Sequence, residues 1–480
     1  MSKLHATQNI QFAATAASCS ELSEGACFRA PLSNQVSITA ASWENKGGLL
    51  TAIFLCGLAV SASAQAPPRL LAREQGFSLP ASTHMPVVVQ TQADAACDLH
   101  LPGDTAHALR FYANPEGYVQ IHFTTKPDPQ ELRAELDCTT ASGIITYPLH
   151  LLTGSGPTAD MPAPRTSIPT PKGARVLPAL TDDSARLLTD YDLVSRGYAP
   201  RPDPEAAPEA YTKWLGRVSR PLTVLKQRSV SSNIPHSVLQ VEDQAGTTAR
   251  NNYNWSGLVA TSAKTDTYSG VQGEWYVPAI VEPESGNNTS SAFWVGVDGY
   301  NLTDLIQAGT EQDSIDFGLA YASSYFAWTE ILPDQPTEQT GNSVNPGDDI
   351  YVGLHIGDST GAYKVHGGWA WITIYDYTQG WVYPYSYQLT ATYYGKTAEW
   401  IMERPQIGSS FAELTNYGAA LMFNAIAETP SGTDPTSFAA ANLVLTLTNQ
   451  KLDGHLDNNV LSSVANLPPN SMSFFWSHFH

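Results

Sequence analysis

Two glutamates near residue 400 are the side chains in this sequence best placed for acid–base chemistry. Glu399 and Glu403 flank Trp400-Ile401-Met402, and the β-forming residues of this segment predict a strand. Side chains two residues apart on a strand share a face, so Glu399, Ile401 and Glu403 would lie on one surface. A carboxylate beside aromatic surface can have a raised pKa and serve as a general acid or base.

The signatures of cysteine and aspartic peptidases are missing from residues 251–480. This region has no cysteine and neither an Asp-Thr-Gly nor an Asp-Ser-Gly triplet. No C-x-x-C or H-E-x-x-H motif occurs anywhere in the chain, so we expect no metal and no cofactor. The histidines of this region are scattered singly, and we expect structural roles for them: His355, His366, His455, His478 and His480.

Five stretches of residues 251–428 resemble, in the same order, motifs of the glutamic peptidase (eqolisin) family of acid-acting endopeptidases. The long chain ahead of them is similar to a bacterial-type precursor with an N-terminal pro-region. The stretches are Asn254-Trp255-Ser256-Gly257, Gly273–Pro278, Trp294–Gly299 with Leu305–Gly309, Ala327–Pro333, and Ala398–Glu403.

The resemblance implies a catalytic dyad of Gln307 and Glu403. Glu403 would activate a water molecule and later protonate the leaving amine, while the neutral Gln307 amide would orient the water and donate to the oxyanion. The resemblance also implies an acid endopeptidase that acts on proteins or peptides and is insensitive to pepstatin. Four further residues match positions that line the cleft or support the dyad: Trp294, Asp298, Glu330 and Glu399.

Two other functions stay open on the residues alone. A β-sandwich glycoside hydrolase would use a pair of carboxylates, either Glu399 with Glu403 or Glu330 with Glu403. A non-catalytic binding or adhesion sandwich would instead use aromatic side chains as a recognition surface. The period-two aromatic pattern from Trp369 to Tyr377 suits either alternative.

The elements that must position these residues are predicted to be strands. From Asn251 onward, short β-branched and aromatic segments alternate with turn residues, which predicts one large antiparallel β-sandwich of the concanavalin A-like kind, and hence an all-β fold. The segments with the clearest strand pattern are 269–277, 291–297, 327–331, 349–356, 369–377, 385–394 and 398–403.

The pro-region divides into three predicted parts ahead of the peptidase domain at 251–480. Residues 65–153 form a small β domain, with strands at 84–91, 110–112, 118–125 and 144–152. Residues 154–180 are a proline-rich linker. Residues 181–250 form a helical basic segment, with helices near 184–193 and from Asp203.

The helical segment is locally basic and precedes a strongly acidic domain. We expect the pro-region to act as an intramolecular inhibitor, and the basic segment is a natural partner for the acidic domain, although a solvated helix face would explain the same charges. The basic residues are Arg217, Arg220, Lys226 and Arg228.

The N-terminal residues predict export. Residues 46–64 carry Lys46, an apolar stretch and Ala62-Ser63-Ala64, the pattern of a secretory signal peptide. We expect residues 1–45 to lie upstream of the true start, and the product to be extracellular or periplasmic without a stable membrane anchor. Removal through Ala64 leaves Cys97 and Cys138 as the remaining cysteines, and we expect them to form a disulfide.

The net charge of the chain argues against some classes of function. The 480 residues carry a net charge of −20. Residues 251–480 hold 5 Lys and Arg against 23 Asp and Glu, a balance of 5 − 23 = −18. Nucleic-acid binding needs basic residues that neutralise phosphates, so this balance argues against it. Self-repulsion fades as carboxylates become protonated, which favours a domain that works in acid.

Overall fold

The computed structural model divides the chain into two units, Met1–Pro67 and Pro68–His480. It describes residues 37–39, 57–59 and 68–479, apart from 155, 170–172, 190–191, 194–195, 200, 202–203, 206–207, 227–248, 282, 284–286, 361–366, 408–409, 430–431, 435–442, 451–455 and 468–469. In the first unit β1 (Ser37–Thr39) pairs antiparallel with β2 (Gly57–Ala59). The rest of the predicted signal peptide lies outside the described residues.

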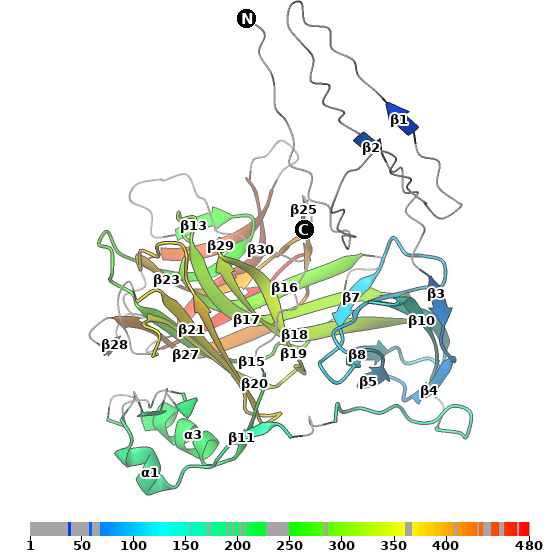
Figure 1. Ribbon diagram of the computed structural model, residues 1–480, viewed down its shortest axis with the longest axis horizontal. Helices are drawn as coiled ribbons and strands as arrows, with labels where there is room; N and C mark the ends of the chain where they lie inside the picture. The colour runs from blue at the N-terminus through cyan, green and yellow to red at the C-terminus, as the bar shows by residue number, and fades with distance from the viewer. Residues whose placement is uncertain are drawn as a thin grey trace, which may run out of the picture. The chain divides into compact units, whose positions relative to one another are not determined.

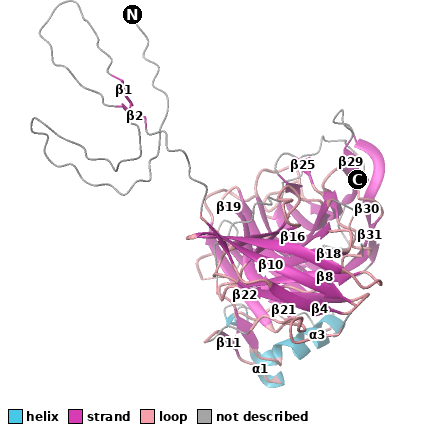
Figure 2. Ribbon diagram, turned by 90° about the vertical axis from the view of Figure 1, so that its right-hand side faces the viewer, coloured by secondary structure: helices cyan, strands magenta, loops and turns pink. Residues whose placement is uncertain are grey.

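Strands dominate the second unit, and the predicted all-β fold is confirmed (Figures 1 and 2). One layer, called the first sheet, contains Gln307 and Glu403. Its strands, in spatial order, are β29 (Leu443–Gln450), β14 (Trp255–Thr261), β23 (Thr397–Glu403), β16 (Asn288–Asp298), β17 (Leu305–Asp316), β18 (Ala320–Leu332) and β19 (Gln335–Ser343). These pairings are all antiparallel, and β13 (Ala249–Asn252) adds to β29 in parallel.

A second sheet packs against the first. Its strands, in spatial order, are β31 (Ser471–Trp476), β27 (Ala419–Thr429), β15 (Gly270–Tyr276), β20 (Asp349–Gly357), β21 (Trp369–Asp376), β22 (Trp381–Gln388), β12 (Leu222–Val224) and β11 (Arg175–Leu177). β30 (Leu456–Leu467) links the two sheets by pairing with β29 and β31. The short strands are β24 (Gln406–Ile407), β25 (Ser410–Phe411), β26 (Glu413–Leu414) and β28 (Gly432–Asp434).

Alternation along the central strand β16 decides what each face of the first sheet carries. Phe293, Val295 and Val297 point into the main core between the two sheets. The alternate residues Ala292 and Trp294 point to the opposite face, where they join a separate apolar cluster. This opposite face carries the candidate site.

The small β domain contains more strands than predicted. Besides the four expected segments, it has β3 (Arg69–Leu71), β4 (Gln75–Leu79), β6 (Ala96–His100) and β9 (Glu131–Thr140). The expected segments correspond to β5 (His84–Gln90), β7 (Leu109–Tyr112), β8 (Tyr118–Thr125) and β10 (Gly143–Thr153). Charged residues such as Glu131, Arg133 and Glu135 alternate with buried ones in β9, which hid its strand character.

The predicted disulfide is present in this domain. Cys97 on β6 lies directly opposite Cys138 on β9, and their sulfur atoms are bonded. Both residues are fully buried. The bridge closes a loop with a sequence separation of 41 residues.

Replacing both cysteines by serine is expected to destabilise the small β domain by about 2–5 kcal/mol, because the unfolded chain regains the entropy of the open loop. Urea unfolding of the full chain, followed by hydrogen exchange of β6 and β9, measures this loss. Unchanged protection of both strands in the variant would contradict the prediction.

The helical segment packs on the outer face of the second sheet (Figure 1). Its helices are α1 (Asp182–Leu187) and α3 (Pro208–Val218), so the second begins later than predicted. Trp214 and Val218 of α3 share a buried cluster with Tyr351, Tyr375 and Tyr377 of the sheet. The aromatic pattern from Trp369 to Tyr377 is therefore partly an internal packing surface.

A basic side chain of α3 contacts carboxylates of the peptidase domain. The Arg217 guanidinium contacts the Glu274 carboxylate and lies 2.5 Å from an oxygen of Asp349, and the Glu274 side chain is only 1% exposed. Lys213 lies 4.2 Å from the centre of the Phe423 ring. These contacts agree with the expected pairing of the basic segment with the acidic domain, and Arg228 lies outside the described residues.

The predicted position of one strand in the second sheet is wrong. The segment 385–394 was expected to be extended throughout, whereas β22 spans Trp381–Gln388. Residues 389–396 instead form a loop whose backbone N–H groups donate to Asp298. Within the described residues, no helix has the length and apolar character needed to cross a membrane.

Candidate active site

The candidate site lies on the outer face of the first sheet, where strand pairing aligns polar residues in rows. Gln307 on β17 lies opposite Gly296 on β16, and Gly296 lies opposite Glu399 on β23. On the other side of β17, Gln307 lies opposite Glu330 on β18. Four residues further along β16, Ala292 lies opposite Glu403.

Gln307 is held by the acid beside it. Its Nε2 donates to Oε2 of Glu330 at 2.6 Å, and Oε1 of Glu330 accepts from the Thr337 hydroxyl at 2.6 Å. All three side chains are buried. This arrangement fixes which end of the Gln307 amide carries the nitrogen and leaves its second N–H available to donate.

Glu403 is held by the predicted tryptophan. Nε1 of Trp294 donates to Oε2 of Glu403 at 2.8 Å, and both residues are fully buried. The Trp294 ring packs edge-on against Trp255, with 4.9 Å between ring centres. Since Trp255 lies opposite Glu403 on β14, two aromatic rings border this carboxylate.

Glu399 lies on the same face, in the row of Gln307. Its carboxylate oxygens make no hydrogen bond of normal geometry, and burial raises the pKa of Glu399 well above its ordinary value. Gly296 separates it from Gln307, and a Cβ there would come within 2.9 Å of the Trp294 ring. The glycine therefore keeps the space between the two polar side chains open.

Asp298 serves the loop beside the site. Its carboxylate accepts the backbone N–H groups of Tyr394, Gly395 and Lys396, each at 2.8 Å. Burial, and then the nearby Asp298 charge, raise the pKa of Asp304 to about 7. These contacts give Asp298 a supporting position, and they identify Asp304 as its neighbour.

The sequence reasoning missed Glu311. This residue is fully buried and lies opposite Ala292, the same residue that faces Glu403 from the other side. Its Oε1 accepts from the Ser290 hydroxyl at 3.0 Å. Glu311 follows Gln307 by four residues on one strand, so period-two alternation could have placed it on the site face.

The register also sets the distance between the two dyad candidates. They are two strands and four residues apart, which corresponds to roughly 16 Å between Cα atoms for a strand spacing of about 4.8 Å and a rise of about 3.3 Å. Both side chains are 0% exposed, so substrate reaches them only after a rearrangement.

Replacing Trp294 by Phe is expected to lower kcat about 10- to 100-fold, because a hydrogen bond to a charged group contributes about 1.5–3 kcal/mol. Steady-state kinetics on a peptide substrate measures the loss. Trp275→Phe is the matched control, since it removes a similar buried hydrogen bond, to Thr310 at 3.0 Å, in the main core. Equal losses of kcat in the two variants would contradict a role for the Trp294 hydrogen bond.

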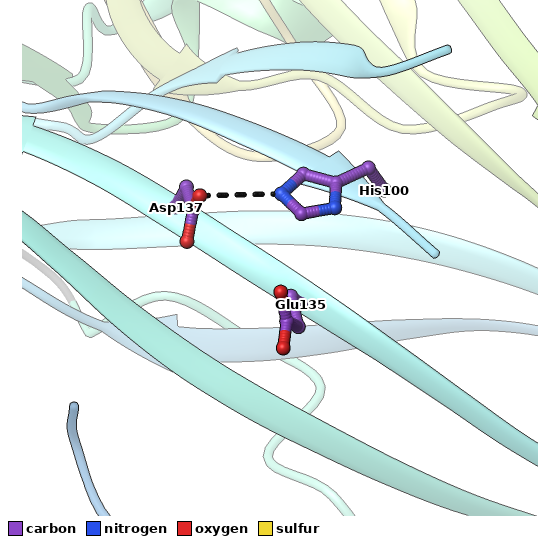
Figure 3. Close-up of side chains that lie close together, drawn as sticks. All are labelled: His100, Glu135 and Asp137. Atoms are coloured by element: carbon purple, nitrogen blue, oxygen red, sulfur yellow. Dashed lines mark hydrogen bonds and ion pairs between the residues drawn. The ribbon is translucent and has the colours of Figure 1, made fainter. Parts of the chain in front are cut away.

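A second polar cluster lies in the small β domain (Figure 3). Ligand atoms of His100, Glu135 and Asp137 lie within 4.8 Å of one another, as in a metal site. Arg69, however, donates to both oxygens of Asp137 at 3.0 Å, and Nε2 of His100 lies 3.2 Å from the same carboxylate. The guanidinium already supplies the positive charge there, so we assign an ion-pair network.

Comparison with known proteins places this site in a family. Residues 253–464 match the family model described as the Peptidase A4 family. The chain is 26% identical over 227 residues to Aspergillopepsin-2 from Aspergillus niger, covering 43% of this chain and 76% of that protein. The domain that carries the site is thus that of a glutamic-type endopeptidase. Residues 253–464, which contain Gln307 and Glu403, thus resemble the Peptidase A4 family.

Solved structures were also compared. The chain is similar to scytalido-glutamic peptidase with a transition-state analogue inhibitor, at 17% identity and a TM-score of 0.36, covering 47% of this chain and 98% of that one. It is similar to SCP-B, a member of the eqolisin family in complex with the tripeptide Ala-Ile-His, at 16% identity and a TM-score of 0.34, with the same coverage.

Proposed function

We propose that the protein is a secreted acid endopeptidase, made as a zymogen, whose catalytic dyad is Gln307 and Glu403. The observation that carries the proposal is that both side chains stand on one buried face of the first sheet, each held by its own hydrogen-bond partner. Trp294 holds Glu403, and Glu330 holds Gln307.

The reaction follows from the two functional groups. The Glu403 carboxylate removes a proton from water, and the water oxygen forms a bond to the scissile carbonyl carbon. The Gln307 N–H donates to the oxygen of that carbonyl as it becomes negative, without itself titrating. Glu403 then returns the proton to the leaving amine as the C–N bond breaks, so the carboxylate is regenerated.

The zymogen proposal is supported by burial of the dyad and by the contacts of the pro-region. Neither Gln307 nor Glu403 is exposed, and both the small β domain and α3 pack on the peptidase domain. Removal of the pro-region in acid would follow naturally from contacts that involve titratable groups. Secretion rests on the predicted signal peptide at 46–64 and on the disulfide.

Digestion of a denatured protein between pH 2 and 7 tests the proposal. The full chain should cleave it in acid only, resist pepstatin and lose its N-terminal segment, as followed by mass spectrometry. Glu403→Gln should abolish cleavage, whereas Glu413→Gln, a carboxylate off the site face, should not. A folded and processed chain that cleaves no protein at any pH would overturn the proposal and favour a glycan-directed or binding function.

A further inference from the structure

The small β domain joins the peptidase domain through a continuous sheet. β8 pairs antiparallel with the end of β18, from Ala320 opposite Thr125 to Ser323 opposite His122. Ile315, Phe317, Ala320 and Ala322 of the peptidase domain are buried in the core of the small domain. We call this contact the β8–β18 seam. The seam has backbone hydrogen bonds and an apolar core, and both favour the docked position of the small β domain.

Two histidines of the small β domain meet at this seam. His84 of β5 and His122 of β8 stack with 5.1 Å between ring centres, and Nε2 of His84 lies 3.1 Å from Nδ1 of His122. Tyr325 of β18 packs edge-on against both rings, at 6.3 and 5.0 Å. A hydrogen bond between two ring nitrogens needs a donor on one and a lone pair on the other, so it exists only while at least one ring is neutral.

The described residues that line the space beside the two rings offer no countercharge to a protonated pair. Beside the rings lies a cavity of about 420 Å³ between the small domain, the linker and the peptidase domain, and its described lining has no carboxylate and no Lys or Arg. Thr124, Tyr325, Gln120, Asn345 and Gln379 are the polar groups near the pair. The carboxylate of Asp348 lies behind this lining, where it accepts from Asn345 and Gln379.

The cavity also connects the pair to water. It is polar and large enough to hold several waters, and Nε2 of His122, Oε1 of Gln120 and Nε1 of Trp381 are buried atoms without a protein hydrogen-bond partner. His84 is the exposed member of the pair, whereas His122 is 2% exposed. Protons therefore have a route to the pair while the seam is closed.

We infer that His84 and His122 form an acid-sensitive latch, which holds the small β domain on the β18 edge at neutral pH and releases it when both rings are protonated. Burial lowers the pKa of His122 to about 3 and lowers that of His84, with the His84 charge adding to the shift at His122. The released domain binds protons that the docked domain excludes. Docking is therefore complete above the ordinary histidine pKa of about 6.5 and weakens as the pH falls below it.

The expected effect is large. His122 alone weakens docking up to about 10-fold for each pH unit below 6.5, or about 100-fold at pH 4.5, and His84 adds to it. The effect of the two histidines on docking does not depend on whether Glu403 is catalytic. A role of the latch in activating the enzyme rests on the proposed function.

Hydrogen exchange of the full chain tests the latch. All samples carry Glu403→Gln, so that self-cleavage cannot release the domain. Between pH 6.5 and 4.5, corrected for intrinsic rates, the amides within residues 122–125 and 320–323 that bond across the seam should lose about 100-fold in protection, while those of β16 and β17 stay protected. The double variant His84→Gln with His122→Asn places an amide nitrogen and an amide oxygen where the two bonded ring nitrogens stood, and it should lose this pH dependence.

Two further variants make the outcome decisive. His107→Gln, an exposed histidine of the same domain, should behave as the parent. If the double variant fails to dock at pH 7.5, the single variant His84→Gln tests the latch instead, because its side chain is exposed. With one titrating ring fewer, the loss of amide protection with falling pH must become less steep. A pH profile that is unchanged in His84→Gln or in the double variant would overturn the latch. Failure of the peptidase proposal would leave these measurements unaffected.

Discussion

Gln307→Ala is expected to lower kcat about 10²- to 10³-fold, with a smaller change in KM, because in the proposed mechanism it removes a donor that acts mainly on the developing oxyanion. Gln307→Glu should be similarly impaired, since a carboxylate at this position, beside Glu330, repels the negative oxygen. Steady-state cleavage of a peptide substrate at the acidic optimum measures both. A glycoside hydrolase that used paired glutamates would be indifferent to the loss of this amide.

Thr337→Val provides the matched control for Gln307. Thr337 donates to the other oxygen of Glu330, so its loss disturbs the same buried acid while leaving the Gln307 amide in place. We expect a comparable loss of stability in Thr337→Val, but kcat within about threefold of the parent. If Gln307→Ala keeps more than about a tenth of the parental kcat, the amide is not the oxyanion donor.

The second large effect concerns stability against pH. We expect the peptidase domain to become more stable from pH 7 to pH 5, by a few kcal/mol, mainly through Glu274 and Asp376. Burial raises the pKa of Glu274 to about 7, although the contact with Arg217 opposes the shift. Burial raises the pKa of Asp376 to about 9, and Asp348 adds to this shift. Each group holds a proton in the folded domain that the unfolded chain releases at these pH values.

The direction follows from these protons. Because the folded state binds more of them between the ordinary carboxyl pKa and the raised values, folding is favoured as the pH falls through this window. The pKa of Asp304 is also raised to about 7, so this group contributes in the same direction. Hydrogen bonds from Thr390 and Ala391 lower the pKa of Asp334 although burial opposes them, so its stabilising effect is lost only below the window.

Thermal unfolding of the Glu403→Gln chain, followed by tryptophan fluorescence, measures this effect. Nine of the eleven tryptophans lie beyond residue 250, so the signal reports mainly on the peptidase domain. The control variant, Glu274→Gln with Asp376→Asn, should flatten the dependence on pH. A midpoint that rises from pH 5 to pH 7 would contradict the prediction.

The two pH responses have opposite directions, which matters for activation. Acid weakens the proposed histidine latch but strengthens the domain to which it is attached. The difference arises from the charge of the buried groups, since a buried histidine resists gaining charge and a buried carboxyl resists losing its proton. Separation of the two parts without unfolding of the enzyme follows from this contrast.

The sequence predicts the fold well where side-chain alternation is strong. β8, β16 and β23 were expected within a few residues, since each shows a β-branched or aromatic pattern between turn signals. β9 was missed because charged residues occupy its exposed positions. β22 was misplaced because tyrosines continue into the loop that Asp298 holds.

The site is less predictable from local pattern. Gln307 and Glu403 are 96 residues apart, so no spacing rule brings them to one face, and only the family resemblance paired them. Alternation along β17 could have added Glu311 once Gln307 was chosen. The contact of His122 with Tyr325 has no local signature at all, since it depends on two domains sharing a sheet.

The β8–β18 seam has a consequence for the processed enzyme in concentrated solution. Loss of the small β domain uncovers an unpaired backbone edge at Ala320–Ser323, next to the apolar side chains of Ile315 and Phe317. Such an edge favours pairing between identical molecules. At neutral pH the −18 charge of residues 251–480 keeps copies apart, but acid removes much of that repulsion. The acid that opens the proposed latch therefore also lowers the colloidal stability of the domain, and the proposed processed form should be least soluble at acidic pH.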